Sequence, residues 1–352
     1  MKGTIKSKIT IIACIVLGLA LVLPSIGTCE YKPKYVSAVM GATATVGYQS
    51  ASSLLSVIKK KTGVRMSFAP ASKTMGRYNF LKSKKAHIGW LPGSDQYFAL
   101  KGIFEFKDLG PQSVRTLWDC GAIDQGLGTR ADSGIKTIAD IKGKRIATYP
   151  TYPMVQLYMD AIMAYANLTW DDVKATPVSS FGAGQRAVIE GAVHAAAVSG
   201  QSAAAYELEA SVHGIHWIEL PNKTPADKAA WARYHKVNPA FYPNTVTTAA
   251  GSSKNKPVQI WGYNYQIGCY DWADQELVYW FVKQMAELYD DYKDVHAYLK
   301  KWTVDWTLNH ELWFVPRAEG FIRYFKEVGK WTPAMEQKNN KLLAMYPQQM
   351  TK

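Results

Sequence analysis

The stretch AHIGWLPGSDQ at residues 86–96 aligns without a gap with VHAAAVSGQSA at residues 193–203, 107 positions further along the chain. Each copy follows an expected helix, over 77–84 and 185–191, and reads as a short apolar strand. Each then ends in a loop of Gly and Ser that opens another helix. The sequence therefore predicts the same helix–strand–helix unit twice, once in each of two lobes.

Strands and helices also alternate around the two copies. Strands are expected at 35–40, 64–68, 88–91, 145–148 and 195–198, and helices at 47–61, 77–85, 138–141 and 154–166. This alternation predicts mainly parallel sheets flanked by helices. Two longer β-rich runs, 114–127 and 259–270, are expected to cross side by side between the lobes as a hinge. The chain from Asp274 onward is expected to be mainly helical.

The length of the chain supports this division. Its 352 residues exceed what a single core usually holds. We expect an export signal over 1–29, the first lobe over 31–122, the second lobe over 123–260, and a return to the first lobe with C-terminal helices over 261–352. A cleft between two such lobes is a common site for a small molecule.

The first thirty residues have the pattern of an export signal. Lys2, Lys6 and Lys8 precede an apolar run over 9–23, and the segment PSIGT at 24–28 resembles the approach to a cleavage site. About 15 apolar residues are too few for a comfortable membrane span, which makes an uncleaved anchor the weaker alternative. Cys29 stands where a lipidated cysteine would, but the preceding residues fit that motif poorly. The sequence predicts a periplasmic protein.

Composition excludes several classes of function. The net charge of +13 comes from scattered lysines, and no RNP-like, zinc-finger or helix-turn-helix pattern accompanies it, so no nucleic-acid partner is expected. A positive cleft would instead attract anionic ligands. No CxxC or Cys/His cluster is present, so no metal site is expected. We expect a monomer without a cofactor.

Cys14 leaves with the signal and Cys29 lies at its edge, so Cys120 and Cys269 are the two cysteines that the mature chain is certain to hold. Each lies in one of the two β-rich runs expected to cross between the lobes. A disulfide between them would form if their Cα atoms came within about 7 Å in an oxidising compartment. Two buried free thiols are the simpler alternative.

Motifs for catalysis are weak. The segment GAGQRA at 182–187 matches the GxGxxA variant of the dinucleotide fingerprint, but the strand after it, 195–198, does not end in the acid that such a site needs. His87 and His194 stand at equivalent points before a strand, where a structural role is expected. The sequence shows no pair of residues with the spacing of a known catalytic motif, which favours a binding protein over an enzyme.

Three segments together carry a family resemblance. KGKRIA at 142–147, LTWDDV at 168–173 and GFIRYFKEVG at 320–329 resemble, in order and spacing, the solute-binding subunits of TAXI-type TRAP transporters. Residues 132–135 and 46–48 also fit, and the similarity covers roughly residues 35–330. The resemblance implies a periplasmic binding protein of the type II-like two-lobed fold. Such a protein closes on a small solute and delivers it to an ion-driven membrane permease.

The chain departs from the family pattern at three points. It has PTYP at 150–153 where the family usually has a Gly-Ser-Gly turn, Lys84 in place of a Gly, and Ala318 in place of a His. These departures affect the choice of ligand rather than the fold. A receptor for an ABC importer is the main alternative, and an exported enzyme that uses the Gly182 loop is a weaker one.

The site itself is expected where strands end and helices begin. Loops at the carboxyl ends of parallel strands present free N–H groups and the positive ends of helix dipoles, which favour a carboxylate. We therefore expect an anionic or zwitterionic solute, with Tyr48, Tyr149 and Tyr152 as walls or as tyrosines that pack on their own lobe. The candidate residues are Thr43, Thr45, Gly47, Tyr48, Ser72, Thr74, Ser94 and Asp95 in the first lobe, and Tyr149, Thr151, Tyr152, Ser179, Gly182, Ser199 and Gln201 in the second.

Overall fold

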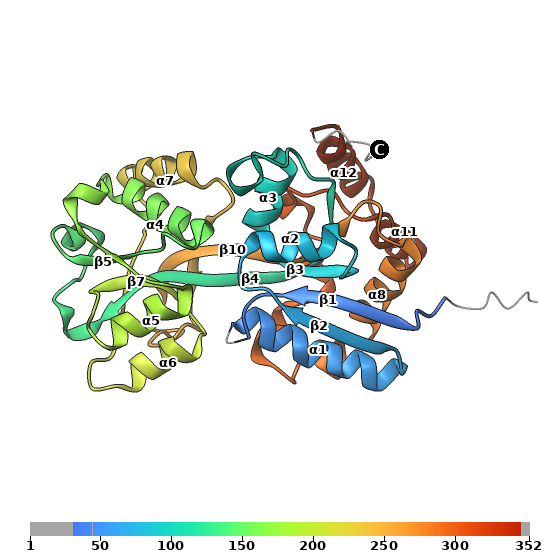
Figure 1. Cartoon of the computed structure of the whole chain (residues 1–352), viewed down its shortest axis with the longest axis horizontal. Helices are drawn as coiled ribbons and strands as arrows, with labels where there is room; N and C mark the ends of the chain where they lie inside the picture. Colours follow the sequence, from blue (N-terminus) through green and yellow to red (C-terminus); the bar gives the residue numbers. More distant parts are fainter. Residues whose placement is uncertain (1–30, 44, 346–352) are drawn as a thin grey trace, which may run out of the picture. The chain divides into compact units, whose positions relative to one another are not determined.

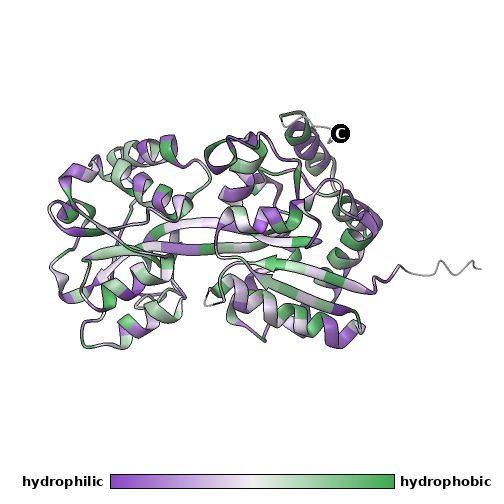
Figure 2. Ribbon diagram, in the orientation of Figure 1, coloured by the Kyte–Doolittle hydropathy of each residue, from purple (hydrophilic) through white to green (hydrophobic). Residues whose placement is uncertain are grey.

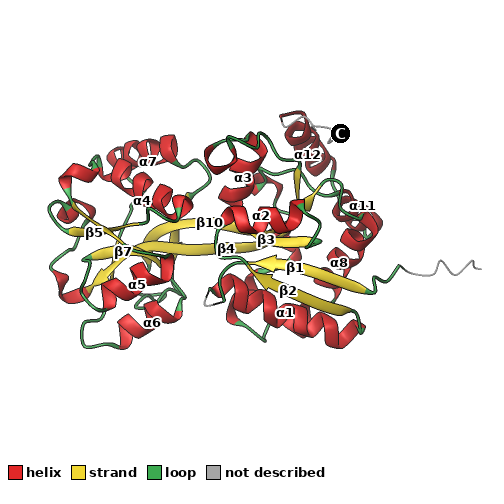
Figure 3. Ribbon diagram, viewed as in Figure 1, coloured by secondary structure: helices red, strands yellow, loops and turns green. Residues whose placement is uncertain are grey.

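A mixed sheet of ten strands runs through the described residues in the order β2-β1-β3-β10-β4-β7-β5-β6, with β8 paired to β4 and β9 to β10. The computed structural model describes residues 31–43 and 45–345, so the expected export signal and Cys29 lie outside it. Helices cover both faces of the strands, as Figure 3 shows. The fold is therefore α/β, as the alternation of strands and helices predicts.

The elements beside β1 form what we call the first lobe. Strand β1 (Tyr35–Met40) pairs in parallel with β2 (Arg65–Pro70) and with β3 (Ile88–Pro92). The helices that follow these three strands are α1 (Val46–Thr62), α2 (Thr74–Lys82) and α3 (Gly93–Lys101). Thr45 starts α1 because its side chain accepts the backbone N–H of Tyr48. Helix α1 carries both hydrophilic and hydrophobic residues (Figure 2), as expected of a helix with one buried face.

The elements beside β5 form the second lobe. Strand β5 (Arg145–Thr148) pairs in parallel with β6 (Lys174–Pro177) and β7 (Ala195–Ser199). Its helices are α4 (Pro153–Ala166), α5 (Phe181–Ile189), α6 (Ala203–Ala210) and α7 (Pro225–Val237). The segment expected as a helix over 138–141 is a short 3-10 turn, Ile138–Ile141. Each lobe thus has the parallel sheet that the sequence predicts.

Two long strands join the lobes. Strand β4 (Val114–Arg130) pairs antiparallel with β10 (Val258–Tyr270), from Val114 opposite Tyr270 to Gln125 opposite Trp261. Figure 1 shows the pair running from the first lobe to the second, with β3 on one side of it and β7 on the other. The register shifts near Gly121, whose φ of +83° is one that glycine adopts easily. These strands match the two β-rich runs of the sequence. The remaining strands are β8 (Ile215–Ile218) and β9 (Tyr242–Val246).

The chain after β10 returns to the first lobe as helices. They are α8 (Gln275–Glu287), α9 (Tyr289–Tyr292), α10 (Val304–Thr307), α11 (Glu319–Glu327) and α12 (Pro333–Met345). The first-lobe core continues into them, because Trp90 of β3 packs edge-on against Phe281 of α8 and lies 6.3 Å from the ring of Trp302. No helix in the described part of the chain is long and apolar enough to span a membrane.

The disulfide hypothesis is wrong. Cys120 and Cys269 are both buried free thiols. Cys269 stands opposite Arg115 in the β4–β10 ladder, and Cys120 lies five positions further along β4. At about 3.3 Å per residue, the two Cα atoms are roughly 16 Å apart, far beyond the reach of an S–S bond. Both cysteines do lie on the crossing strands, but not side by side.

Candidate functional site

A cavity of about 370 Å³ lies between loops of the two lobes, with the crossing strands behind it. Its first-lobe wall comes from the segment that opens α1, the loop before α2, and the end of β3. Its second-lobe wall comes from the starts of α4, α5 and α6. These are carboxyl ends of parallel strands, where the site is expected from the sequence.

Eight of the fifteen candidate residues line this cavity: Thr45, Gly47, Ser72, Thr151, Tyr152, Ser179, Gly182 and Ser199. They come from both lobes, so the structure brings together residues that are up to 154 positions apart in the chain. Their contact with a ligand stays a prediction.

The other seven candidates do not line the cavity. They are Thr43, Tyr48, Thr74, Ser94, Asp95, Tyr149 and Gln201. Tyr48 instead packs edge-on against Phe68 of β2, 5.9 Å away. Tyr149 is fully buried behind α5, where its hydroxyl leaves no room for a side chain at Gly184. Gln201 donates a hydrogen bond to Asp124 at 2.7 Å. Asp124 lies on the face of β4 opposite to the cavity, because its neighbours Ile123 and Gln125 line the cavity and it does not.

Asp95 and Thr74 lie one layer behind the cavity and hold Arg77, which lines it. The carboxylate of Asp95 accepts from the Arg77 Nη2 at 2.7 Å and from the Thr74 hydroxyl at 2.8 Å. Asp95 is fully buried, and Arg77 is only 3% exposed. Burial acts to lower the pKa of Arg77, but Tyr152 and Asp95 outweigh it and raise that pKa above its ordinary value. Arg77 is therefore a permanently charged group at the edge of the cavity.

The equivalent place in the second lobe is neutral. The 107-residue offset aligns Asp95 with Ser202, and it puts Gln185 one position beyond the equivalent of Arg77. The Ser202 hydroxyl donates to the Gln185 side chain at 2.8 Å, and both residues line the cavity. Ser202 also caps α6 by accepting the backbone N–H of Ala205. The same position thus carries an ion pair in one lobe and a hydrogen bond between neutral groups in the other.

Tyrosines of β10 form the back of the cavity. Tyr263 and Tyr265 alternate along the strand, so both side chains face the same side of the sheet. Gly47 packs directly on the Tyr265 ring, because a Cβ at Gly47 would lie 2.6 Å from it. On the second-lobe side, Tyr158 lies 6.3 Å from the Tyr263 ring. The aromatic surface is thus continuous with the second-lobe core.

Sequence reasoning missed these residues for identifiable reasons. Arg77 lies inside a helix rather than in a loop, and it falls three residues after the predicted Thr74. Tyr263 and Tyr265 lie in a strand whose sequence predicts only a crossing between the lobes. Their alternation within a long β-rich run was the available signal, because residues two apart share one face of a strand.

The Gly182 motif lies inside a helix. Helix α5 begins at Phe181, after Ser180 accepts the backbone N–H of Ala183. Gly182 is therefore in the first turn, and a Cβ there would meet nothing within 4 Å. Gly184 is required for packing instead, because a Cβ there would lie 2.2 Å from the Tyr149 hydroxyl. Gly184 thus permits close packing, and Gly182 leaves space beside the cavity. The segment is helical from Phe181 onward and does not form the glycine-rich loop of a dinucleotide-binding motif.

The charges that line the cavity have one sign. Arg77 lies within it, Lys73 stands exposed at its rim, and no Asp or Glu of the described residues lines it. Gln125 also lines it, 4% exposed, and its side-chain oxygen has no partner in the described part of the chain. No group of three or more His, Cys, Asp or Glu among the described residues could hold a metal ion. The arrangement suits binding of an anion beside an aromatic surface.

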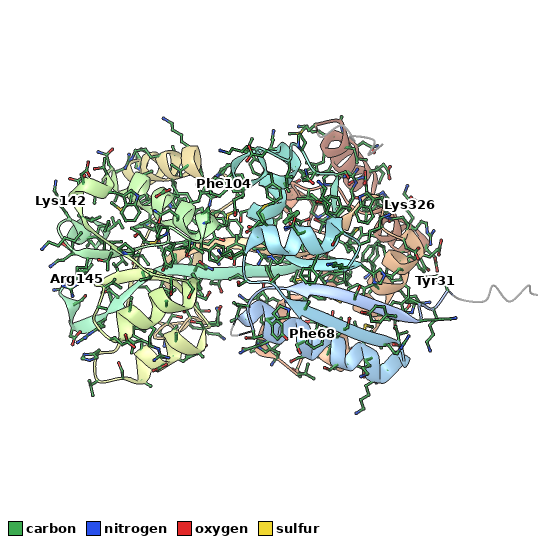
Figure 4. All side chains as sticks on the ribbon, in the orientation of Figure 1. Tyr31, Phe68, Phe104, Lys142, Arg145 and Lys326 are labelled. Atoms are coloured by element: carbon green, nitrogen blue, oxygen red, sulfur yellow. The ribbon has the colours of Figure 1, made fainter. Side chains whose placement is uncertain are left out.

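The histidines of the two copies have the structural role expected of them. His87 Nδ1 accepts the backbone N–H of Ser37 at 2.9 Å, and His194 Nδ1 accepts that of Arg145 at 3.1 Å. Each histidine therefore ties the start of one strand to its neighbour. Figure 4 shows Arg145 at the end of the second lobe that is remote from the first, so His194 lies far from the cavity.

Comparison with known proteins identifies the family. The model described as the NMT1-like family matches residues 40–329. The chain belongs to the NMT1-like family. No curated protein sequence matches this NMT1-like chain significantly.

Solved structures that resemble this NMT1-like protein are distant in sequence. A protein from Bordetella bronchiseptica RB50 is 14% identical, with 90% of this chain and 91% of that chain covered and a TM-score of 0.45. The periplasmic aliphatic sulphonate binding protein SsuA of Escherichia coli is 13% identical, with 88% and 79% covered and a TM-score of 0.43. PhnD1 of Prochlorococcus marinus (MIT 9301), in complex with methylphosphonate, is 10% identical, with 85% and 100% covered and a TM-score of 0.47. Likeness at this level does not carry a ligand from one protein to another.

Proposed function

We propose that this protein is an extracytoplasmic solute receptor that binds a small anionic molecule in the cavity between its lobes. The observation that carries the proposal is the cavity itself, which both lobes line at the carboxyl ends of their parallel strands. Pockets at this place in α/β folds commonly hold ligands. Membership of the NMT1-like family is consistent with such a role.

Binding rather than turnover is proposed because the cavity offers recognition groups without a catalytic set. Arg77, Lys73, several serines and a tyrosine surface line it. No histidine or carboxylate of the described residues does so. A general base would be expected in the cavity if the protein were a hydrolase or transferase.

The proposed partner is a membrane permease of the TRAP type. This assignment rests on the segments at 142–147, 168–173 and 320–329, which resemble TAXI-type subunits. A permease of the ABC type fits the fold as well. The neighbouring genes distinguish the two, because a fused multispanning permease would support TRAP delivery and an ATPase would contradict it. The periplasm is the proposed location, because the first 29 residues have the pattern of an export signal.

Native mass spectrometry of freshly purified protein, followed by a thermal-shift screen of metabolites, tests the proposed binding. We expect at least one small anion to raise the melting temperature. The variant Gly182→Phe should abolish that shift, since its side chain would project from an open position that lines the cavity.

The matched control is Ala203→Phe, at an exposed helix position outside the cavity, and it should keep the shift. Equal ligand binding by both variants would show that the solute binds elsewhere. A screen in which no metabolite binds would contradict receptor function.

A further inference from the structure

The guanidinium of Arg77 has one N–H group without a partner. Its Nη1 donates to the carbonyl of Ala71 at 3.1 Å and lies 3.4 Å from that of Ser72. Its Nη2 donates to Asp95 at 2.7 Å and lies 3.5 Å from the Thr74 hydroxyl. The Nε, in contrast, is buried and has no hydrogen-bond partner among the described residues. An unpartnered buried donor of this kind is unfavourable, because it has lost its hydrogen bonds to water without gaining others.

The second-lobe groups around the cavity do not supply a carboxylate for this donor. The second lobe lines the cavity with the neutral pair Gln185 and Ser202 and with the hydroxyls of Thr151, Ser179 and Ser199. Tyr152 interacts with the Arg77 guanidinium through its charge and a side-chain hydrogen bond. Burial nevertheless raises the pKa of Tyr152, so its hydroxyl stays neutral near pH 7 and supplies no negative charge. An acceptor for the Nε, which an anion would supply, has to come from outside the described residues.

The charge balance limits that anion to a single charge. Asp95 already neutralises Arg77, so the pair contributes no net charge inside the cavity. Lys73, exposed at the rim, adds one positive charge and so balances one negative charge on a ligand. A dianion would bury a second charge without a counter-ion, which is costly.

An ammonium group on the ligand would also lack a counter-ion. Asp95 is fully buried behind Arg77 and does not line the cavity. Glu105, the other acid near Arg77, does not line it either. Because burial without a carboxylate partner penalises a charged amine, the cavity disfavours a zwitterion.

The remaining surface of the cavity is aromatic. Tyr152, Tyr158, Phe181, Tyr263 and Tyr265 all line it. Aromatic side chains bind flat apolar groups through large contact areas and favourable ring geometry. A cavity of about 370 Å³ lies near the lower end of the range for small-molecule pockets.

We infer that the solute is an aromatic monocarboxylate, with its carboxylate on the Arg77 Nε and its ring against the tyrosines of β10. This inference rests on the proposed receptor function and narrows it. It excludes amino acids and dicarboxylates as the preferred ligands. Arg77 is then the residue that selects for an anion, and Asp95 is a positioning residue that holds the guanidinium.

Calorimetric titration with three probes of one carbon skeleton tests the inference. 3-Phenylpropanoate carries the carboxylate alone, L-phenylalanine adds an ammonium group, and 3-phenylpropan-1-ol lacks the charge. We expect 3-phenylpropanoate to bind at least about tenfold more tightly than either of the others. The alcohol lacks the charged hydrogen bond, and the ammonium group of L-phenylalanine would be buried without a carboxylate partner. Equal or tighter binding of L-phenylalanine would overturn the inference.

Variants of the Arg77–Asp95 ion pair form the second part of the test. The double variant Arg77→Gln/Asp95→Asn keeps the cavity neutral, and Arg77→Lys keeps the charge without the Nε donor. Both variants should lower the affinity for 3-phenylpropanoate about tenfold or more and leave the affinity for 3-phenylpropan-1-ol unchanged. The control Arg130→Gln/Asp132→Asn removes a partly exposed ion pair outside the cavity and should change neither affinity.

Melting temperatures of all variants show whether each one folds. Unchanged affinity for 3-phenylpropanoate in a folded Arg77→Lys variant would overturn the role of the Nε. If none of the three probes binds but the metabolite screen finds another anion, the receptor function stands and the aromatic monocarboxylate is rejected. If neither experiment finds a ligand, both proposals fail.

Discussion

In the first helix–strand–helix copy the buried carboxylate of Asp95 pairs with Arg77, whereas in the second copy Ser202 replaces Asp95 and bonds the neutral Gln185. One structural contact is shared by both copies, since His87 and His194 tie the starts of β3 and β7 to the neighbouring strands in the same way. The copies therefore share this contact between strands and differ in the polar pair at or just behind the cavity wall. The difference places a buried ion pair on one side of the cavity and neutral polar groups on the other.

The largest expected effect is on stability at the ion pair. Asp95→Ala leaves the guanidinium of Arg77 buried without its counter-ion and should lower the free energy of unfolding by about 3–5 kcal/mol. Ser202→Ala removes a neutral hydrogen bond and a helix cap, and should cost only about 0.5–2 kcal/mol. Urea denaturation followed by circular dichroism measures both. Equal losses of unfolding free energy in the two variants would mean that the ion pair of the first copy stabilises the protein no more than the neutral pair of the second.

A smaller effect is expected at the two glycines of α5. Gly184→Ala places a Cβ 2.2 Å from the buried Tyr149 hydroxyl, so we expect a loss of about 1–3 kcal/mol from overpacking. Gly182→Ala meets nothing within 4 Å and should be neutral or slightly stabilising, because alanine is the better helix former. Thermal unfolding of the two variants compares them directly. A stable Gly184→Ala protein would show that Tyr149 moves aside easily.

The smallest effect concerns the two histidines and pH. Burial lowers the pKa of both His87 and His194 from 6.5, and nearby Arg145 adds to the shift at His194. A lowered pKa means that the folded state prefers the neutral ring, so stability is complete above pH 6.5 and is lost as pH falls through the lower folded pKa. Each His→Ala variant should flatten this acid-side loss.

His87→Ala should also cost more stability at pH 7 than His194→Ala. The His87 ring is the more buried of the two, and its Nδ1 also lies 2.9 Å from the Ser37 hydroxyl. Melting temperatures between pH 5 and pH 8 check both points. An unchanged pH profile in both variants would contradict the structural role of the rings.

Much of the fold was predictable because the segments with strong patterns are short and clearly bounded. Tyr35–Met40 and Arg145–Thr148 are strands with the expected limits, and the two crossing runs appear as β4 and β10. The register between those two strands was not predictable, because the residues around Cys120 and Cys269 do not determine which residue of the partner strand each one faces. The disulfide hypothesis failed for that reason.

The candidate site was predicted less completely than the fold. Loops at strand ends were found, including Ser72, Thr151 and Ser199, because strand order alone gathers them at one edge. Which side chains face inward depends on helix rotation and packing. Arg77 and Tyr265 therefore appear in the cavity without a signal in their own sequence neighbourhood, while Thr74 and Asp95 turn out to support Arg77 from behind.

The antiparallel pairing of β4 and β10 has a topological consequence for the second lobe. The chain leaves the first lobe along one strand and comes back along its neighbour, and Gln125 stands opposite Trp261 in the ladder. Paired residues of antiparallel strands have Cα atoms about 5 Å apart. The whole segment between them is thus a cassette with adjoining ends. Such a cassette can be exchanged for that of a relative while the remainder of the protein keeps its own chain path.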